Sequence, residues 1–337
     1  MNTMKAYAIN DVKGHGIANM PIPTPRSSQV LIKVMAVGLC GTDAHIYKGE
    51  YFGKYPIVPG HEFAGIIEAV GDGVTAFSPG DRVSADPNIF CDNCPACKAN
   101  RQNFCNHLEV AGVTTNGAMA QYMAISEKCV FHIDDIPFTH GALIEPLACV
   151  VHGQNMLAPK LGSRTLVIGA GPIGLMHMQI GRQNGFVAVC DVKNENLETA
   201  KRLGADAVLL SADVADFIAA NGRFDVVIDC TGVPAAIEAA LPWVEDMGTL
   251  LIFGVCPSDS RITVNPYEVF RRELRIIGSF ALRKTFAQAM RLAANSRLNL
   301  DALVGAKITL DEMPQYMENF TKGKTTLKTI MYPNGLC

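Results

Sequence analysis

Residues 165–174 read TLVIGAGPIG, a short apolar run that leads directly into the pattern Gly-x-Gly-x-x-Gly. In a strand–turn–helix unit that binds a dinucleotide, each glycine has a separate task. Gly169 allows the tight turn, Gly171 lets the backbone approach a pyrophosphate, and Gly174 lets the helix pack closely on the strand. The pattern alone is weak evidence, because 30 glycines allow chance matches.

The sequence that follows supports a nucleotide site. Pro172 and Ile173 open the expected helix, whose free N–H groups can bind an anion. The next apolar run, 186–190, ends at Asp191, 17 residues beyond Gly174. An acidic residue at about this distance meets the adenosine ribose hydroxyls.

Asp191 also bears on the choice of cofactor. A 2'-phosphate about 4 Å from its carboxylate would be repelled by about 4 kcal/mol at an intermediate dielectric. NAD is therefore favoured over NADP, although the neighbouring Lys193 could weaken the preference. A flexible surface lysine is the alternative interpretation of Lys193.

Further apolar runs stand at 207–210, 224–229 and 249–254, so strands and helices are expected to go on alternating along the chain. Runs of this length and composition are typical of buried parallel strands. The sequence therefore predicts an α/β fold, with a doubly wound parallel sheet over about residues 151–275.

Residues 1 to about 150 have a different character, with β-branched strands and Gly/Pro turns. Strands are expected at 29–37, 62–70 and from 79–83 onward. Cys40 follows the first of these strands, and His61 and Glu62 stand at the start of the second. A thiolate, an imidazole and a carboxylate suit a catalytic zinc with an open fourth position. The alternative is a buried cysteine and a loop histidine.

Four of the 11 cysteines crowd together at Cys91, Cys94, Cys97 and Cys105. In a reducing compartment this spacing indicates a metal rather than disulfides, and four thiolates can close a tetrahedral structural zinc site. An iron–sulfur cluster is the competing interpretation. Nothing else in the sequence calls for electron transfer, so zinc is favoured.

Composition limits the class of protein. The chain has 337 residues, of which 49% are hydrophobic and 18% charged, with a formal net charge of -3. Two packed domains are expected at this length. No basic run favours nucleic acid or an anionic membrane, and no signal-peptide core is present at the start, so a cytoplasmic protein is expected.

Two segments connect and close these domains. Residues 145–153 predict a helix that begins after Pro146 and bridges the domains. From 276 onward the chain returns to mixed structure, with a helix expected at 286–293 and a closing strand at 328–332.

Taken together, these motifs resemble the zinc-containing medium-chain dehydrogenases over nearly the whole chain. The residues that carry the resemblance are 38–43 (GLCGTD), 59–62 (PGHE), 80–83 (GDRV), the four-cysteine lobe, 144–147 (IEPL) and 169–174 (GAGPIG). The resemblance implies a GroES-like catalytic domain at 1–150, a Rossmann NAD-binding domain inserted at 151–275, and a return to the catalytic domain at 276–337.

Within that family the carboxylates resemble those of polyol (sorbitol-type) dehydrogenases and L-threonine 3-dehydrogenases. Either Glu62 or Glu145 then completes the catalytic zinc shell with Cys40 and His61. One glutamate at a time keeps the site neutral, whereas two make it anionic and a poorer Lewis acid. Zinc lowers the pKa of bound water from 15.7 to about 7. It would lower the pKa of a bound alcohol in the same way, so that the alkoxide forms at neutral pH.

The resemblance also assigns the other catalytic and cofactor-binding residues. Thr42 and His45 match a hydroxyl-to-imidazole relay that carries the proton out, with the cofactor ribose between them. An exposed loop histidine is the alternative for His45. Further contacts with NAD are expected from Thr231, Gly254, Val255 and Ser279.

The expected substrate is a small polyol, oxidised at a secondary hydroxyl to a ketose. Ala281 and Leu282 replace an Arg-Tyr pair of the sorbitol enzymes, and Ile46 replaces a tyrosine, so sorbitol itself is in doubt. Oxidation of L-threonine is the alternative activity, and a protein that kept the fold without the chemistry is a further one. The resemblance implies about two zinc ions per chain and a homo-oligomer, a tetramer or a dimer.

Overall fold

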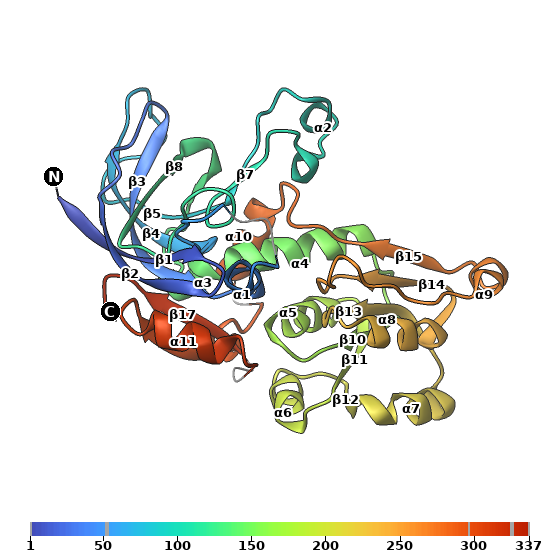
Figure 1. Cartoon of the computed structure of the whole chain (residues 1–337). Coiled ribbons are helices and arrows are strands. Elements are labelled where there is room, and N and C mark those ends of the chain that lie inside the picture. The colour runs from blue at the N-terminus through green and yellow to red at the C-terminus, as the bar shows by residue number, and fades with distance from the viewer. Residues whose placement is uncertain (1, 51–53, 296, 324–326, 336–337) are drawn as a thin grey trace. The chain divides into compact units, whose positions relative to one another are not determined.

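The computed structural model describes residues 2–50, 54–295, 297–323 and 327–335 (Figure 1). The chain divides into two compact units, one formed by Met1–Ala148 with Leu282–Cys337 and the other by Cys149–Ala281. The second unit is thus an insertion in the sequence of the first. No helix in the described ranges has the length and apolar character needed to cross a lipid bilayer.

The first unit is built on a sheet of β16 (Val304–Thr309), β17 (Lys328–Tyr332), β3 (Gln29–Gly38), β4 (Glu62–Val70), β5 (Arg82–Ala85) and β9 (Val130–His132), in that order, with β8 (Tyr122–Ser126) also paired to β3. β3 runs antiparallel to both β4 and β17, so that Gly38 lies opposite Glu62 and also opposite Ile330. The end of β3 therefore meets the start of β4 and the middle of β17, which comes from the other end of the chain (Figure 1).

A hairpin of β1 (Thr3–Asp11) and β2 (Gly14–Pro21) adds to the core of this unit. Tyr7, Ile32 and Phe63 are completely buried there. Most residues of β3 and the first half of β4 are buried, and the β-branched and aromatic side chains of these segments favour strands in such surroundings. The predicted strands at 29–37, 62–70 and 328–332 are all present.

The inserted unit is a parallel sheet with the strand order β12-β11-β10-β13-β14-β15. These strands are β12 (Ala207–Leu210), β11 (Gly185–Asp191), β10 (Ser163–Ile168), β13 (Phe224–Asp229), β14 (Val244–Ile252) and β15 (Arg275–Gly278). Every registered pair in this sheet is parallel. Relative to chain order this is 3-2-1-4-5-6, the doubly wound arrangement that binds dinucleotides. The predicted fold class is confirmed.

The helices α5 (Pro172–Gly181), α6 (Asn194–Arg202), α7 (Val214–Asn221) and α8 (Pro234–Ala240) connect these strands. The strands in the middle of the sheet are buried, as their continuous apolar runs predict. The expectation of a buried strand at 207–210 is wrong, because β12 is the edge strand and its residues are only half-buried. The unit reaches Ala281, beyond residue 275 expected from the sequence, because β15 pairs with β14.

Helix α4 (Ile144–Leu157) begins earlier than predicted. The sequence placed its start after Pro146, yet Pro146 lies inside the first turn. Proline is tolerated there because the first N–H groups of a helix have no carbonyl partner within the helix. The earlier start places Glu145 in the first turn of α4.

Candidate metal and cofactor sites

The ligand atoms of Cys40, His61 and Glu62 lie within 4.8 Å of one another. Cys40 is the N-cap of α1 (Gly41–Lys48), directly after β3, and the other two residues stand at the start of β4. The antiparallel pairing of Gly38 with Glu62 brings these strand ends together. One sulfur, one nitrogen and one carboxylate form a donor set that suits zinc.

Asp43 holds this group in place. It is completely buried, and its Oδ2 accepts a 2.9 Å hydrogen bond from the backbone N–H of Cys40. Its Oδ1 accepts a 3.2 Å bond from the N–H of Gly60 and lies 3.6 Å from Nδ1 of His61. The carboxylate therefore orients both backbone segments that carry ligands, a supporting role common around metal-binding histidines.

The electrostatics of the group favour a cation. Burial alone would lower the pKa of His61, but the charges of Cys40 and Asp43 raise it well above its ordinary value. A position at which a buried imidazole gains a proton is one with a strongly negative potential. The donor set and this potential together fit a divalent metal ion.

Glu145 provides a second carboxylate close to the group. It is almost completely buried, and burial raises its pKa to about 7, with a further contribution from the charge of Glu62. Its oxygens are not among the ligand atoms that lie within 4.8 Å of one another. In this geometry Glu62 is thus the nearer of the two glutamates named from the sequence.

The structure adds Lys328, which the sequence analysis placed only in a closing strand. Its Nζ lies 2.8 Å from both carboxylate oxygens of Glu62, and the side chains of Lys328 and Glu62 are 6% and 1% exposed. Burial would lower the pKa of Lys328, but the charges of Glu62 and Cys40 raise it above its ordinary value. A lysine at the head of the otherwise uncharged run TIMY is the signal that could have found it.

Thr42 and His45 lie on α1, close behind Cys40. The sulfur of Cys40 is 3.7 Å from Oγ1 of Thr42. The side chain of His45 is 38% exposed, and its Nδ1 lies 2.8 Å from Oε2 of Glu50. The helix therefore carries a hydroxyl beside the thiol and, further on, an imidazole that reaches solvent.

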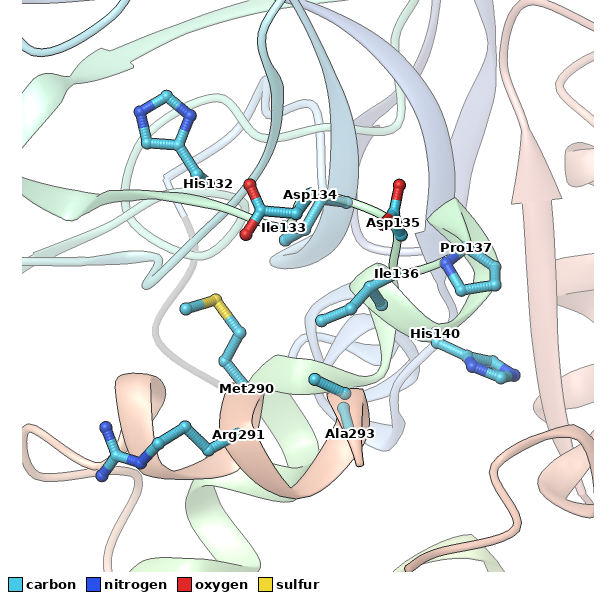
Figure 2. Close-up of a pocket in the computed structure, with 11 residues that line it drawn as sticks. His132, Ile133, Asp134, Asp135, Ile136, Pro137, His140, Met290, Arg291 and Ala293 are labelled. Atoms are coloured by element: carbon cyan, nitrogen blue, oxygen red, sulfur yellow. The ribbon is translucent and has the colours of Figure 1, made fainter. Parts of the chain in front are cut away.

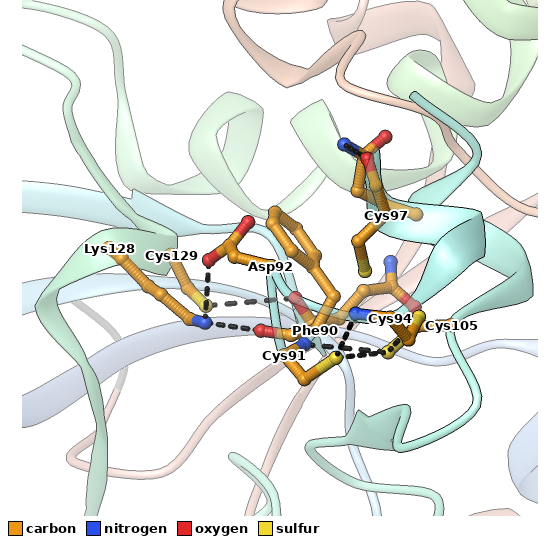
Figure 3. Close-up of polar contacts among 10 residues, drawn as sticks. Phe90, Cys91, Asp92, Cys94, Cys97, Cys105, Lys128 and Cys129 are labelled. Atoms are coloured by element: carbon orange, nitrogen blue, oxygen red, sulfur yellow. Dashed lines mark hydrogen bonds and ion pairs between the residues drawn. The ribbon is translucent and has the colours of Figure 1, made fainter. Parts of the chain in front are cut away.

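The four-cysteine lobe forms a second metal-ligand group (Figure 3). The sulfur atoms of Cys91, Cys94, Cys97 and Cys105 lie within 4.8 Å of one another, on the segment around the short helix α2 (Pro95–Lys98). Backbone N–H groups of Cys97 and Asn106 lower the pKa of Cys94, which favours its thiolate. Four sulfur donors fit a closed tetrahedral zinc site.

The lobe has almost no apolar core of its own. The cysteines pack mainly with Phe90, Ala96 and Leu108. Lys128 connects the segment at the start of the lobe to the rest of the unit, because its ammonium group donates to the carbonyl of Phe90 and to Oδ2 of Asp92, 3.1 Å away (Figure 3). Ligation and this tie are expected to hold the lobe together.

In the inserted unit, the glycine turn has the geometry that a nucleotide site needs. Gly169 has a φ of +100°, which favours glycine, and a Cβ on Gly174 would lie 1.9 Å from the carbonyl oxygen of Gly169. A Cβ on Gly171 would meet no atom within 4 Å, so the space over the turn is open to a phosphate group. At the end of β11, Oδ2 of Asp191 accepts a 2.8 Å bond from Ala170 N–H.

The other expected cofactor contacts follow the next strands. Asp229, at the end of β13, accepts hydrogen bonds from the N–H and the hydroxyl of Thr231, at 3.1 and 2.6 Å. A Cβ on Gly254 would lie 2.0 Å from the nitrogen of Gly232, so the two loops touch through backbone. Val255 beside them is 67% exposed. The hydroxyl of Ser279 is buried and has no hydrogen-bond partner among the described residues.

A separate pocket of about 600 Å³ lies in the first unit, between residues 132–140 and α10 (Phe286–Ala294) (Figure 2). Both of its histidines are engaged elsewhere. Nε2 of His140 lies 2.8 Å from Asp301, and Nε2 of His132 lies 3.2 Å from the carbonyl oxygen of Ala76. Its aspartates, Asp134 and Asp135, are exposed, and this pocket shows no organised set of donors.

Comparison with known proteins agrees with this arrangement. Residues 26–135 match the family model of the alcohol dehydrogenase GroES-like domain, and residues 172–295 match that of the zinc-binding dehydrogenases. D-altritol 5-dehydrogenase of Agrobacterium fabrum is 35% identical over 94% of this chain and 96% of its own. The chain belongs to the zinc-containing medium-chain dehydrogenases.

Other members of this dehydrogenase family differ in their named substrates. D-arabinitol dehydrogenase 1 of Uromyces fabae is 33% identical over 98% of this chain and 97% of its own. L-threonine 3-dehydrogenase of Thermococcus kodakarensis is 32% identical over 99% and 97%, respectively. Family membership therefore establishes the class of zinc-dependent alcohol dehydrogenases without fixing the substrate.

Two solved structures of dehydrogenases are closely similar and carry different nucleotides. A zinc-binding dehydrogenase from Sinorhizobium meliloti bound to NADP is 33% identical, with a TM-score of 0.93, over 99% of this chain and 100% of its own. An Escherichia coli alcohol dehydrogenase complexed with NADH is 28% identical, also with a TM-score of 0.93 and the same coverage. The fold alone thus leaves the choice between NAD and NADP to local residues.

Proposed function

We propose that this chain is an NAD-dependent zinc dehydrogenase that oxidises a secondary hydroxyl of a polyol to a ketone. The observation that carries the proposal is the group of Cys40, His61 and Glu62, with Glu145 as a second carboxylate nearby. Two carboxylates beside one cysteine follow the polyol-type pattern. The polyol names of similar relatives support the same substrate class.

The residues divide the chemistry between them. Cys40, His61 and one of the two glutamates would hold the zinc, with Asp43 fixing the backbone that carries them. Zinc bound there would supply Lewis acidity, which favours loss of the proton from a substrate hydroxyl. His61 and Glu62 are buried, and a low dielectric around them strengthens these electrostatic interactions.

The proton needs a route to solvent. The hydroxyl of Thr42 beside Cys40 is placed to take part in the hydrogen bonding of the alcohol. His45 is placed to receive the proton at its imidazole, because its ring reaches solvent and is held by Glu50. A base with an exposed face can return the proton to water after each turnover.

The nucleotide site favours NAD. The nicotinamide of NAD accepts the hydride, and the chain contributes by fixing the cofactor's position. The open space over Gly171 suits the pyrophosphate, and the carboxylate of Asp191 is anchored by Ala170 N–H where a 2'-phosphate would be repelled. Thr231, Gly254, Val255 and Ser279 remain proposed contacts.

A simple experiment tests the function. The purified chain is incubated with NAD and a polyol, the formation of NADH is followed by absorbance, and the product is analysed for a ketose. Cys40→Ser is the control, since it removes the thiolate from the proposed metal site. Equal NADH formation by both proteins would contradict the proposed centre.

Oxidation of L-threonine is the second candidate, because of the 32% identity with the Thermococcus enzyme. Threonine carries an ammonium and a carboxylate group, so its recognition needs charged partners that a neutral polyol does not need. A screen that contains both substrates separates the two.

We also propose that the protein assembles with copies of itself. The edge strand β15 and the preceding α9 (Pro266–Arg271) expose Tyr267, Phe270 and Ile276. An unpaired edge with apolar side chains is a natural place for a second copy to pair. Light scattering would distinguish a dimer or tetramer from a monomer.

A further inference from the structure

A buried acid outside the metal-ligand group has one oxygen without a partner. Asp86 directly follows β5 and is 8% exposed. Its Oδ1 accepts hydrogen bonds of 2.9 Å from the backbone N–H of Asn88 and of 2.7 Å from Nδ2 of the same residue. Its Oδ2 has no donor in the described part of the chain, and it is not one of the completely enclosed polar atoms that lack a partner. This oxygen is therefore open to a group from outside the chain.

Strand pairing places Asp86 beside the metal-ligand group. β4 and β5 are antiparallel, and Ala64 lies opposite Ser84. Glu62 stands two residues before Ala64, and Asp86 stands two residues after Ser84, so both acids lie in the same direction from this pair. Because side chains alternate between the faces of a sheet, both acids share the face of Ala64 and Ser84.

Helix α3 (Phe138–Ala142) covers this face of the sheet. A Cβ on Gly141 would lie 2.7 Å from Cβ of Ala64, and the hydroxyl of Ser84 donates a 2.9 Å hydrogen bond to the carbonyl of Gly141. α4 follows α3 almost directly and carries Glu145 in its first turn. The helices thus bring the second candidate glutamate to the face on which Asp86 lies.

The electrostatics connect Asp86 with the two glutamates. Burial raises the pKa of Glu145, and the charges of Glu62 and Asp86 raise it further, which requires the three carboxylates to be near one another. Unlike Glu62, which pairs with Lys328, Asp86 has no cationic partner among the described residues. Burial raises the pKa of Asp86 to about 6, so its carboxylate is ionised at neutral pH. A buried anion with a free oxygen is stabilised by a donor that reaches it.

The chemistry of a carboxylate limits what this donor can be. An ionised carboxylate only accepts hydrogen bonds, so its partner must carry an O–H or N–H group. An alcohol bound at Cys40 and His61 would supply such a group if it had a second hydroxyl beside the one that is oxidised. A phosphate or carboxylate at that position would instead be repelled by the acids.

We propose that Asp86 is a substrate-binding residue whose Oδ2 accepts a hydrogen bond from a hydroxyl on the carbon next to the reacting one. The preferred substrate is then a neutral polyol with two adjacent hydroxyls. Asn88 is a positioning residue, because it holds Oδ1 and leaves Oδ2 to the substrate. This inference rests on the proposed function, since it requires an alcohol bound at the metal-ligand group.

The test uses the full-length enzyme with NAD and three probes that share one reacting carbon. Propan-2-ol, propane-1,2-diol and 1-aminopropan-2-ol would all be oxidised at C2, and on C1 they carry no donor, a hydroxyl and an ammonium group, respectively. The measured quantity is kcat/KM for the diol divided by that for propan-2-ol. Asp86→Asn should lower this ratio by about tenfold, the difference between a hydrogen bond to a charged acceptor and one to a neutral acceptor.

A second readout needs no turnover. With Co²⁺ in place of zinc and no nucleotide present, the change in d–d absorption on addition of each alcohol gives its dissociation constant. Difference spectra against the alcohol-free protein cancel the contribution of the four-cysteine lobe. Asp86→Asn should weaken binding of the diol, relative to propan-2-ol, by a factor similar to that seen in the rates.

Two further variants make the result specific. Asn88→Ala removes the side-chain donor to Oδ1 but keeps the carboxylate, so it should lower the same ratio by about threefold. It also keeps the test possible if Asp86→Asn folds poorly. Asp135→Asn removes an exposed carboxylate of the same unit, in the separate pocket, and should leave the ratio at the wild-type value.

The outcomes separate this inference from the proposed function. Equal ratios in the wild type, Asp86→Asn and Asn88→Ala would overturn the role of Asp86. A wild-type preference for 1-aminopropan-2-ol over the diol would overturn the choice of a neutral polyol, because the donor would then be an ammonium group. A wild-type protein that neither oxidises the probes nor shows a cobalt response to them would overturn the proposed function itself.

Discussion

Nδ1 of His45 lies 2.8 Å from Oε2 of Glu50, at the end of the helix that begins beside Cys40. This contact fixes the imidazole ring and leaves its Nε2 free of that partner. A histidine held in one orientation at the protein surface is suited to move protons between a site and bulk water.

His45→Gln is therefore expected to lower turnover at neutral pH by about a hundredfold, the contribution of a typical general base. Activity should recover in part at high pH or with added imidazole, because hydroxide or a free base then removes the proton. The measurement is kcat as a function of pH, with and without imidazole.

His140→Gln provides a matched control for this experiment. His140 also lies 2.8 Å from a carboxylate, that of Asp301, but it belongs to the separate pocket described above. This variant should retain the wild-type pH profile. A His45→Gln enzyme with an unchanged profile would show that His45 carries no proton in the reaction.

Cofactor choice is the second prediction. Asp191→Asn keeps an oxygen that can accept the hydrogen bond from Ala170 N–H, but it removes the charge. The ratio of kcat/KM for NAD to that for NADP should fall by up to about a thousandfold, since repulsion of a 2'-phosphate is worth about 4 kcal/mol.

Asp206→Asn is the control for Asp191. Its carboxylate also accepts a backbone hydrogen bond in the same sheet, 2.8 Å from Val187 N–H, but it does not follow the C-terminal end of β11. Its cofactor ratio should stay at the wild-type value. If both variants keep that ratio, Asp191 does not select the cofactor.

Acid lability of the inserted unit is the third prediction. His177 in α5 is completely buried, and burial lowers its pKa to about 3 from an ordinary value of 6.5. Between these two pH values the unfolded chain holds more protons than the folded one, so stability is full above pH 6.5 and decreases as the pH falls. The free energy of unfolding should lose about 2 kcal/mol between neutral pH and pH 5 from this group.

His177→Gln removes this titration and should make the decrease between pH 7.5 and pH 5 smaller by that amount. Urea unfolding at the two pH values gives the comparison, with His107→Gln as the control at an exposed position. An equal decrease in the wild type and His177→Gln would show that another group causes the acid lability.

The four-cysteine lobe gives the fourth prediction. Lys128→Met removes the contacts with Phe90 and Asp92 that tie the lobe to its unit. Because both charged side chains are partly exposed, the effect should be modest, with about fivefold faster zinc release to a chelator. Lys98→Met, at an exposed lysine of α2, should release zinc at the wild-type rate; equal rates in all three proteins would show that ligation alone holds the lobe.

Most of the fold could be predicted from the sequence because its signals are local. The run 165–174 contains a strand, a turn and the start of a helix in one stretch, and its glycines mark the positions where the backbone turns tightly or packs closely. The start of α4 was missed because Pro146 was read as a boundary, although the first turn of a helix tolerates proline. The exposure of β12 was missed because its composition resembles that of an inner strand.

The sequence predicted those residues of the candidate site that belong to recognisable motifs. Cys40, His61 and Glu62 stand at strand ends, and pairing of β3 with β4 is enough to bring them together. Lys328 was missed because its role depends on β17 pairing with β3 across almost the whole length of the chain. The contact of Glu50 with His45 likewise requires the C-terminal turn of α1, which no motif describes.

The central claim is tested most directly by initial rates of nicotinamide reduction, measured with NAD and with NADP. The substrates are sorbitol, xylitol, arabinitol, ribitol, galactitol, polyol phosphates, L-threonine and simple alcohols. The account predicts rapid turnover of at least one polyol, with NAD preferred over NADP. Turnover of L-threonine alone, or of no polyol by a protein that carries zinc at both sites, would contradict it.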